Sequence, residues 1–367
     1  MPFELPAYQL PDFSTDLFRA APLTRFEAAP KDGVAPEGFH ATSVFPEYFH
    51  LFPARWVLLR DSRMDCVVVR RGEVELEVVE ARRLREGEFV ACGRRENGEE
   101  GIFVQDRPFE IPGGGGQEKF AFRTGHSRET SFSRDYDELY ELLRFERESG
   151  FILWVLGPAV VFDRDSREAL CRLIDAGFVQ AVLAGNALAT HDIEGDLFGT
   201  ALGCELYTKK GAYGGHYHHL DSLNRLRSIG SIEAAVQQEL LASGVMMSLC
   251  RRRIPYVLAG SIRDDGPMPG VISDSLKAQD AMRSLTRRAT TVIGLATQLH
   301  SIATGNMTPC YRVLESGGIR PVYFYSVDMT EFAAGKLSDR GSVTARSILT
   351  NVQDFVVNLE RALLGNR

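Results

Sequence analysis

The chain has 367 residues, of which 44% are hydrophobic and 25% charged, and its formal net charge at pH 7 is -7. A protein of this size and composition buries a large core and is expected to form two domains. The acidic balance argues against a nucleic-acid-binding protein, and no apolar run approaches the roughly 20 residues that cross a bilayer, so we expect neither nucleic acid nor a membrane as partner.

The six cysteines are scattered without a CxxC pair, which leaves zinc-ribbon and thioredoxin-like interpretations without support. The N-terminal stretch MPFELPAYQLPDF carries no basic segment before an apolar one, so we expect no secretory signal. We therefore expect a cytoplasmic protein whose thiols are reduced and mostly buried.

The first part of the chain reads as an arm followed by β-structure. Residues 1–45 are rich in proline and aromatic residues without periodicity, which predicts an irregular arm. Residues 55–112 hold short β-rich runs separated by turn sequences, which predict a small, mostly antiparallel β-domain or barrel. The PGGGGQ loop at 112–117 marks the expected boundary, so we divide the chain into residues 1–120 and a second domain, residues 121–367.

Apolar strand-like runs alternate with helical patterns in the second domain. We expect one long helical pattern over residues 230–253, broken at Gly244, with Ser231 and Glu233 at its start. The fold class predicted is therefore α/β, a mostly parallel Rossmann-like sheet domain after a small β-rich domain. The expected strands are 151–162, 178–185, 256–261, 290–297, 321–328 and 347–351.

Polar residues follow several of these strands, and ligands of open α/β sheets bind outside such strand ends. Asp328 ends a hydrophobic run and can accept hydrogen bonds from ribose hydroxyls, or can instead cap the following helix. Arg263, Asp264 and Asp265 place two carboxylates beside a cation, which suits amine binding or simply orders a loop.

Histidines supply further candidates. His191, Asp192 and Glu194 follow one strand and suit either function or a helix start. The GGHYHH stretch holds His216, His218 and His219, but HExxH is absent, so we expect no metal and consider one of these histidines an acid or base. GxGxxG, GxSxG and P-loop motifs are also absent, and SGGIRP at 316–321 reads as a turn.

Four stretches together resemble a known family. They are AGNALATHDIE (184–194), GGHYHHL (214–220), AGSIRDDGP (259–267) and ATQLHSIATGNM (296–307). They are similar to the LOR/SDH-domain family, which includes the archaeal-type ornithine cyclodeaminase and the C-terminal half of some cyanobacterial arginine dihydrolases. The resemblance is dense from Gly157 to Val352.

The resemblance implies a Rossmann-like domain of the deoxyhypusine synthase type with tightly bound NAD. Family members usually carry aspartate where Asn351 stands, so that contact is expected to differ. The segment between Met307 and Asp328 is longer here, and we expect it to reshape the mouth of the pocket. The NAD-contacting positions implied are Asn186, Ala187, Asp265, Thr297, Gln298, Leu299, His300, Asp328, Asn351 and Val352.

The resemblance also implies conversion of L-ornithine to L-proline and ammonia through internal oxidation, cyclisation and reduction. His191, Asp192 and His219 are the candidate acids and bases. Arg263 is the candidate clamp for the substrate carboxylate, and Asp264 or Glu194 would hold the δ-ammonium.

Two other functions remain open at this point. One is NAD-dependent chemistry on another diamino acid or polyamine, such as lysine or diaminobutyrate. The other is a non-catalytic amino-acid sensor that holds NAD. By analogy with the fold we expect a homodimer or homotetramer.

Overall fold

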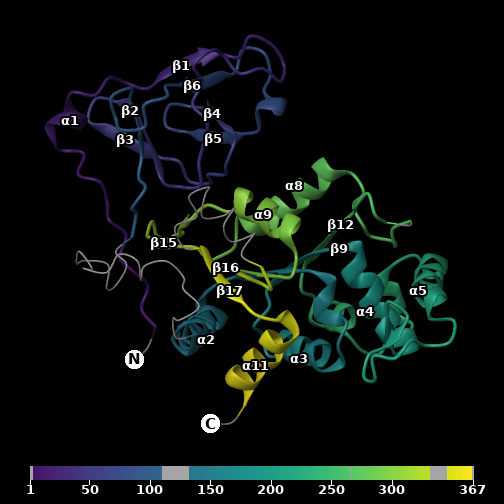
Figure 1. Cartoon of the computed structure of the whole chain (residues 1–367). Coiled ribbons are helices and arrows are strands. Elements are labelled where there is room, and N and C mark those ends of the chain that lie inside the picture. The colour runs from purple at the N-terminus through teal and green to yellow at the C-terminus, as the bar shows by residue number, and fades with distance from the viewer. Residues whose placement is uncertain (1–2, 110–131, 265, 331–344, 366–367) are drawn as a thin grey trace.

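The computed structural model describes residues 3–109, 132–264, 266–330 and 345–365. A small β-rich region from the N-terminal third of the chain lies at one end, beside a larger α/β region (Figure 1). The predicted boundary loop at 112–117 lies outside the described residues. Among the described residues, no helix has the length and apolar character needed to cross a membrane.

Two antiparallel sheets build the N-terminal region. One sheet has the order β1-β6-β4-β5 and the other β3-β2-β7. Phe49 and Leu51 of one sheet pack with Val68 and Ala91 of the other, so the two sheets share a core. The strands are β1 (Arg25–Ala28), β2 (Glu47–Phe52), β3 (Arg55–Leu58), β4 (Val67–Arg70), β5 (Leu76–Val79), β6 (Phe89–Cys92) and β7 (Ile102–Val104).

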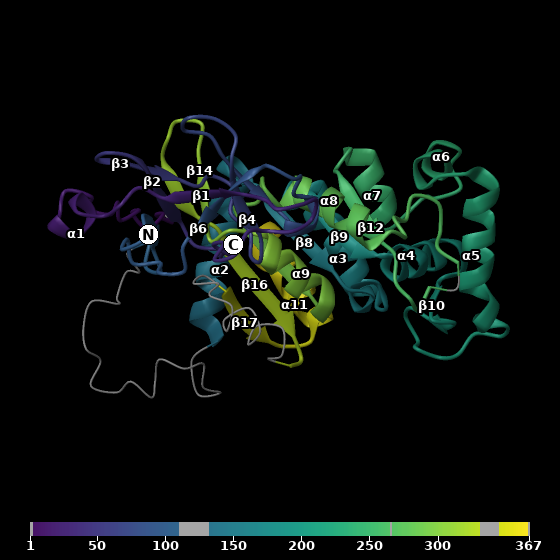
Figure 2. The same cartoon turned by 90° about the horizontal axis from the view of Figure 1, so that it is seen from above.

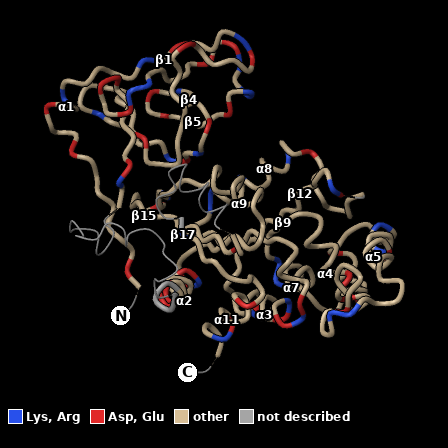
Figure 3. Tube along the Cα trace, viewed as in Figure 1, with Lys and Arg blue, Asp and Glu red and all other residues tan. Residues whose placement is uncertain are grey.

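The prediction of a wholly irregular arm was wrong in one respect. Strand β1 falls inside residues 1–45 and pairs with β6, after the short helix α1 (Asp16–Arg19). Its sequence RFEA is too short to display alternation, and its pairing with β6 across a long sequence gap makes it a strand. Charges of both signs occur in the N-terminal region (Figure 3), and Arg71 there forms ion pairs with Glu77 and Glu88.

The α/β region is built on six parallel strands in the order β12-β9-β8-β13-β16-β17. Counted along the chain, this is the doubly wound order 3-2-1-4-5-6 of Rossmann folds. The predicted parallel α/β fold is thus confirmed. The strands are β8 (Ile152–Leu156), β9 (Ala181–Gly185), β12 (Tyr256–Ala259), β13 (Thr291–Leu295), β16 (Tyr323–Asp328) and β17 (Ala345–Leu349).

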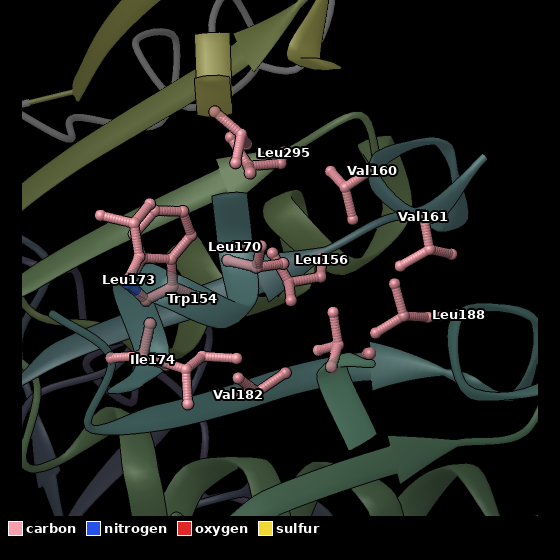
Figure 4. Packing of buried hydrophobic residues seen from close by; sticks show 14 of the residues in the cluster. Trp154, Leu156, Val160, Val161, Leu170, Leu173, Ile174, Val182, Leu188 and Leu295 are labelled. Carbon is pink, nitrogen blue, oxygen red and sulfur yellow. The ribbon is translucent and has the colours of Figure 1, made fainter. Parts of the chain in front are cut away.

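Helices cover both faces of this sheet (Figures 1 and 2). In β8, Ile152, Trp154 and Leu156 pack toward α2, α3 and α11, whereas Leu153 and Val155 pack toward α8 and the end of α9. Figure 4 shows Trp154 among the residues of the first of these clusters. The covering helices are α2 (Phe132–Ser149), α3 (Arg164–Asp175), α8 (Ser275–Thr286), α9 (Gln298–Met307) and α11 (Val352–Leu364).

The segment expected as one long helical pattern is two helices, α6 (Ile232–Gln237) and α7 (Val245–Arg252). Glu239 has a φ of 59° and Gly244 a φ of 104°, and positive φ values end a right-handed helix. The expected start is confirmed, because the Ser231 hydroxyl accepts a hydrogen bond from the Ala234 amide at 3.0 Å.

The hairpin β14 (Tyr311–Val313) and β15 (Ile319–Pro321) joins the two regions. It precedes β16 and therefore lies at the amino ends of the parallel strands. The Cys310 amide donates to the Val44 carbonyl at 2.8 Å, and the Tyr311 hydroxyl donates to the Leu59 carbonyl.

The six cysteines are all unpaired; Cys66, Cys92 and Cys310 are buried, Cys171 and Cys250 half-buried, and Cys204 exposed.

Candidate active site

The carboxyl ends of the parallel strands bring most of the predicted residues to one edge of the sheet. Asn186 and Ala187 open helix α4 (Asn186–Phe198) directly after β9. Thr297 to His300 open α9 after β13, and Asp328 ends β16. Asn351 and Val352 open α11 after β17. Asp265 follows β12 but lies outside the described residues.

Two loops meet closely at the point where the strand order reverses, between β8 and β13. The Gly157 amide donates to the Leu295 carbonyl at 2.7 Å, and a Cβ at Gly157 would stand only 2.0 Å from the Ala296 carbonyl oxygen. Only glycine permits this approach. On the next strand, a Cβ at Gly185 would stand 3.5 Å from Cε1 of His300. The starts of α4 and α9 are therefore neighbours.

Both helix starts leave their first amides without a side-chain cap. The cap residue of α4 is Gly185, which has no side chain, and that of α9 is Thr297, whose side chain accepts no hydrogen bond from its helix. Uncapped amides and the helix dipole favour a bound anion such as a pyrophosphate. Asp328, on the strand next to β13, accepts from the Thr330 amide at 3.3 Å. A helix start beside a strand-end carboxylate fits the phosphate and ribose of a dinucleotide.

Asn186, His300 and Asn351 each have a defined environment at this edge. The Asn186 side-chain oxygen accepts from the Met268 amide at 3.1 Å, which ties the loop after β12 to α4. His300 is half-buried, and burial lowers the pKa of its imidazole, so the ring is neutral at neutral pH. Asn351 caps α11 by accepting from the Gln353 amide at 2.8 Å.

A histidine–carboxylate pair lies on α4, about two turns from its start. The Nδ1 of His191 is 2.8 Å from Oε2 of Glu194. The Glu194 side chain is fully buried, and it also accepts from the Gly203 amide at 2.9 Å. Burial acts to raise the pKa of this carboxyl, but the hydrogen bonds from His191, Gly203 and Thr200 outweigh burial and lower the pKa. Glu194 is therefore a carboxylate at neutral pH.

Thr200 extends this pair to a second histidine. Its hydroxyl donates to Oε1 of Glu194 at 2.8 Å and lies 2.9 Å from Nδ1 of His218. Because the single hydroxyl proton is given to Glu194, His218 must donate from its own Nδ1. His218 stacks on Phe198 with ring centroids 4.6 Å apart. One buried carboxylate thus orders two imidazoles through Nδ1 and leaves both Nε2 atoms free of this network.

The third histidine of the cluster stands close by. The ring centroid of His219 is 6.5 Å from that of His191, and Phe162 meets His191 edge-on at 5.3 Å. Helix α5 (Gly215–Ile229) supplies His218 and His219, while Phe162 follows the turn after β8. His216, at the start of α5, is exposed. Within the described ranges, no three His, Cys, Asp or Glu side chains are grouped to hold a metal ion.

Asp192 lies on the same helix but belongs to a different network. Its carboxylate accepts from Nε of Arg167 at 2.7 Å and from the amides of Val245 and Met246 at 3.0 and 2.8 Å. Asp192 is 1% exposed, and its bonds cap the start of α7. The structure does not bring it together with the histidines.

The loop after β12 carries the remaining candidates. Asp264 accepts from the Ser261 amide at 2.8 Å and orders the turn. Arg263 is exposed, and its guanidinium has no ion-pair partner among the described residues. The segment from Thr308 to Val327 does not reshape this edge, contrary to the sequence-based expectation. It forms the β14–β15 hairpin at the opposite ends of the strands, because the chain must return there after α9 to start another parallel strand.

Sequence reasoning missed Thr200 and did not select His218 among the three histidines of the GGHYHH stretch. No spacing marks them, since Thr200 meets His218 only because the short hairpin β10 (Thr200–Ala201) and β11 (Cys204–Glu205) folds back beside α5. A close approach at Gly203 permits this, because its Cβ would stand 2.7 Å from the Gly215 carbonyl carbon. The one available signal was the glycine pair at 214–215 beside the histidines.

Residues 139–359 match the family model described as arginine dihydrolase ArgZ-like, C-terminal, Rossmann fold. The chain belongs to this ArgZ-like family. It is also similar over 92% of its length to an ornithine cyclodeaminase of Methanocaldococcus jannaschii, with 40% identity and 77% of that protein covered. The family resemblance inferred from the four sequence stretches is confirmed.

Solved structures agree with this ArgZ-like assignment. A conserved LOR/SDH protein from Methanococcus maripaludis S2 superposes with a TM-score of 0.83 and 36% identity, covering 93% of this chain and 98% of that one. The ternary complex of AgrE with ornithine and NAD+ superposes with a TM-score of 0.56 and 32% identity. That comparison covers 95% of this chain and 47% of AgrE.

Proposed function

We propose that this chain is an NAD-dependent ornithine cyclodeaminase that converts L-ornithine to L-proline and ammonia. The observation that carries the proposal is the His191–Glu194 pair on α4. The first turn of the same helix lies at the carboxyl ends of the parallel strands, where the residues that fit a dinucleotide are found. The name of the M. jannaschii relative and the ornithine and NAD+ bound by AgrE support the same reaction. The reaction balances without an external oxidant, because ornithine contains all the atoms of proline and ammonia.

The residues at the strand ends fit NAD. The uncapped amides of α4 and α9 would receive the pyrophosphate, and Asp328 would accept hydrogen bonds from a ribose. His300, neutral and beside Gly185, would add no competing charge. NAD supplies the hydride acceptor and donor for the oxidation and reduction that the reaction requires. The positions proposed to contact it are Asn186, Ala187, Asp265, Thr297, Gln298, Leu299, His300, Asp328, Asn351 and Val352.

The protein's own part is to hold ornithine and move protons. His191 donates from Nδ1 to Glu194, so its Nε2 carries a lone pair that can take a proton from the α-ammonium of ornithine. The buried carboxylate then stabilises the imidazolium, which can return the proton to the departing ammonia. His219, the nearby imidazole, can receive protons from the same region.

The charges of ornithine need partners as well. Arg263 is exposed and unpaired among the described residues, and its planar fork suits the α-carboxylate. Asp264 is the candidate for the δ-ammonium, with one oxygen already accepting from the Ser261 amide and the other open to a cation. We assign Asp192 a positioning role, because Arg167 and two α7 amides occupy its carboxylate.

The test is to incubate the purified protein with L-ornithine, without added NAD, and to measure proline and ammonia. Equal amounts of both products, made over many turnovers, would support a cyclodeaminase with a retained cofactor. If no product forms even with NAD supplied, ornithine is not the substrate. Lysine and 2,4-diaminobutyrate assayed in parallel would then separate another diamino-acid enzyme from a non-catalytic sensor.

An oligomer is part of this proposal, and the surface around the start of α5 supports it. Tyr207, Tyr213 and Tyr217 are 77%, 105% and 59% exposed there. Exposed aromatic residues gathered in one region commonly mark protein interfaces. Light scattering on the protein as it elutes from a size-exclusion column measures its molar mass and would distinguish a homodimer or homotetramer from a monomer. A cytoplasmic location stays a prediction from the cysteine pattern.

A further inference from the structure

A hollow of about 220 Å³ lies where the N-terminal region, the end of α8 and the β14–β15 hairpin meet. It is at the amino ends of the parallel strands, on the opposite edge from the dinucleotide-fitting residues. We call it the arginine hollow. Its lining residues include Arg60 from the loop after β3, Arg287 from the end of α8 and Arg312 from β14.

Like charges converge in the arginine hollow from three segments far apart in the sequence. Arg60, Arg287 and Arg312 form no ion pair with any described residue. Asp61 is the single carboxylate in the lining, and it too forms no ion pair within the described ranges. The lining therefore has an excess of two positive charges, three arginines against one aspartate. Bringing like charges together costs free energy unless an anion compensates.

The walls of the hollow are fixed by hydrogen bonds that do not use the three guanidinium forks together. Buried Arg283 donates to the carbonyls of Asp61 and Ser62 at 2.7 and 3.1 Å, and so holds the loop that carries Arg60. The Tyr311 hydroxyl donates to the Leu59 carbonyl. Arg312 donates one hydrogen bond to the Arg288 carbonyl, which leaves the rest of its fork unassigned.

The electrostatic state of the neighbouring arginines agrees with a crowded positive region. Burial, followed by the charges of Arg287 and Arg63, lowers the pKa of Arg283 to about 10. Burial, followed by the charges of Arg320 and Arg288, lowers the pKa of Arg312. Each of these shifts would be relieved by an anion bound among them.

We propose that the arginine hollow binds a phosphoryl group, as inorganic phosphate or as the phosphate of a small metabolite, at the junction of the two regions. The arginine fork matches two phosphate oxygens at once, and a dianion balances the excess of two charges in the lining. A bound phosphoryl group would join Arg60, Arg287 and Arg312, and with them the N-terminal region, α8 and the hairpin. The site is separate from the proposed active site and does not depend on the reaction.

Inorganic phosphate is the probe, and the whole 367-residue chain is used throughout. Equilibrium dialysis of radioactive phosphate at constant ionic strength should give saturable binding of one phosphate per chain. Arg287→Gln and Arg312→Gln should each raise the dissociation constant about tenfold, since each removes a charged hydrogen-bonding partner. Arg94→Gln removes an exposed arginine elsewhere on the surface and should leave binding unchanged. Equal loss in all three variants, or no saturable binding, would overturn the proposal.

Thermal unfolding supplies an independent readout, because the Tm difference between Arg287→Gln and wild type should have one sign without phosphate and the opposite sign with it. Without phosphate, Arg287→Gln should raise Tm because it relieves repulsion. With phosphate at about ten times the wild-type dissociation constant, wild-type Tm should rise by about 2 °C, whereas that of the variant, which binds about tenfold more weakly, should rise by only about 0.5 °C. Sulfate at equal ionic strength is the control for a general effect of salt on Tm. If phosphate raises the Tm of wild type and of Arg287→Gln equally, the specific site is contradicted. Unlabelled glycerol 3-phosphate and unlabelled inorganic phosphate are then compared as competitors of the bound radioactive phosphate. If glycerol 3-phosphate competes at the lower concentration, the site takes a phosphate ester; if it competes more weakly, the site takes free phosphate.

Discussion

His191 and Glu194 stand three residues apart on α4, and Nδ1 of the imidazole lies 2.8 Å from a carboxylate oxygen that is completely buried. This spacing puts both side chains on one face of the helix. Since the carboxylate keeps the proton of His191 on Nδ1, the free Nε2 is the atom that can exchange protons with a substrate. The first two predictions follow from this relationship.

Substituting His191 should abolish most turnover while leaving the cofactor in place. We expect His191→Asn to lower kcat by about 100-fold or more, the usual loss when a general base is removed. NAD released on denaturation should match the wild-type amount. His216→Asn is the control, since His216 is exposed and outside the network, and should turn over normally. Normal kcat in His191→Asn would remove the proposed role.

Thr200 should act on the rate through Glu194 without touching the substrate. Thr200→Val removes the hydrogen bond to Oε1 of Glu194 and should lower kcat about tenfold at constant KM, while Thr200→Ser restores it. Because the pKa of Glu194 is lowered, its carboxylate persists well below neutral pH. Glu194→Gln should therefore reduce kcat across the whole pH range in which glutamate side chains are ordinarily ionised. Identical kcat for the valine and serine variants would contradict this role.

Asp192 should prove a stability residue. Asp192→Ala leaves Arg167 buried without its partner and uncaps α7, which should cost about 3–5 kcal/mol in the free energy of unfolding. Urea unfolding measures this loss. The ion pair of Arg164 with Glu168 is exposed, so Arg164→Ala should cost about 1 kcal/mol or less. A fully stable but inactive Asp192→Ala protein would instead place Asp192 in the chemistry.

Asp328 should contribute to NAD affinity. Asp328→Ala removes the proposed acceptor of ribose hydroxyls, and we expect NAD to bind about tenfold more weakly, in line with the loss of a charged hydrogen bond. Isothermal titration of protein stripped of cofactor would measure the change. Asp354→Ala, which removes a carboxylate from the first turn of α11, is the matched control. Unchanged affinity in Asp328→Ala would rule out the contact.

A buried pair in the N-terminal region should make stability depend on pH. His40 and Glu47 are buried, with Nε2 and Oε2 2.9 Å apart. Burial acts to lower the pKa of His40, but Glu47 outweighs burial and the pKa is raised. A raised histidine pKa gives stability that is complete below about pH 6.5 and is lost as pH rises through the folded-state value. Unfolding free energy should therefore fall between pH 6.5 and alkaline pH, and His40→Gln should flatten that slope.

Much of the nucleotide edge could be predicted from sequence, because buried parallel strands appear as continuous apolar runs whose polar ends meet at one edge. Asp328 was placed in this way, whereas Asn186 was placed by the family resemblance. Asp192 could not be distinguished from His191 by sequence, because its partner Arg167 comes from another helix. Strand β1 and the Thr200–His218 contact also depend on long-range packing, which local patterns do not encode.

The parallel strands also separate the arginine hollow, at their amino ends, from the proposed active site at their carboxyl ends. Strand β8 has five residues and is therefore about 16 Å long, roughly twice the distance over which physiological salt screens a charge. The direct electrostatic interaction between a phosphoryl group at the arginine hollow and a substrate at the opposite edge is therefore weak. Any communication between the two ends must then travel as a mechanical displacement of α8 or the hairpin, so it would show in exchange rates of backbone amides and not in the pH profile of turnover.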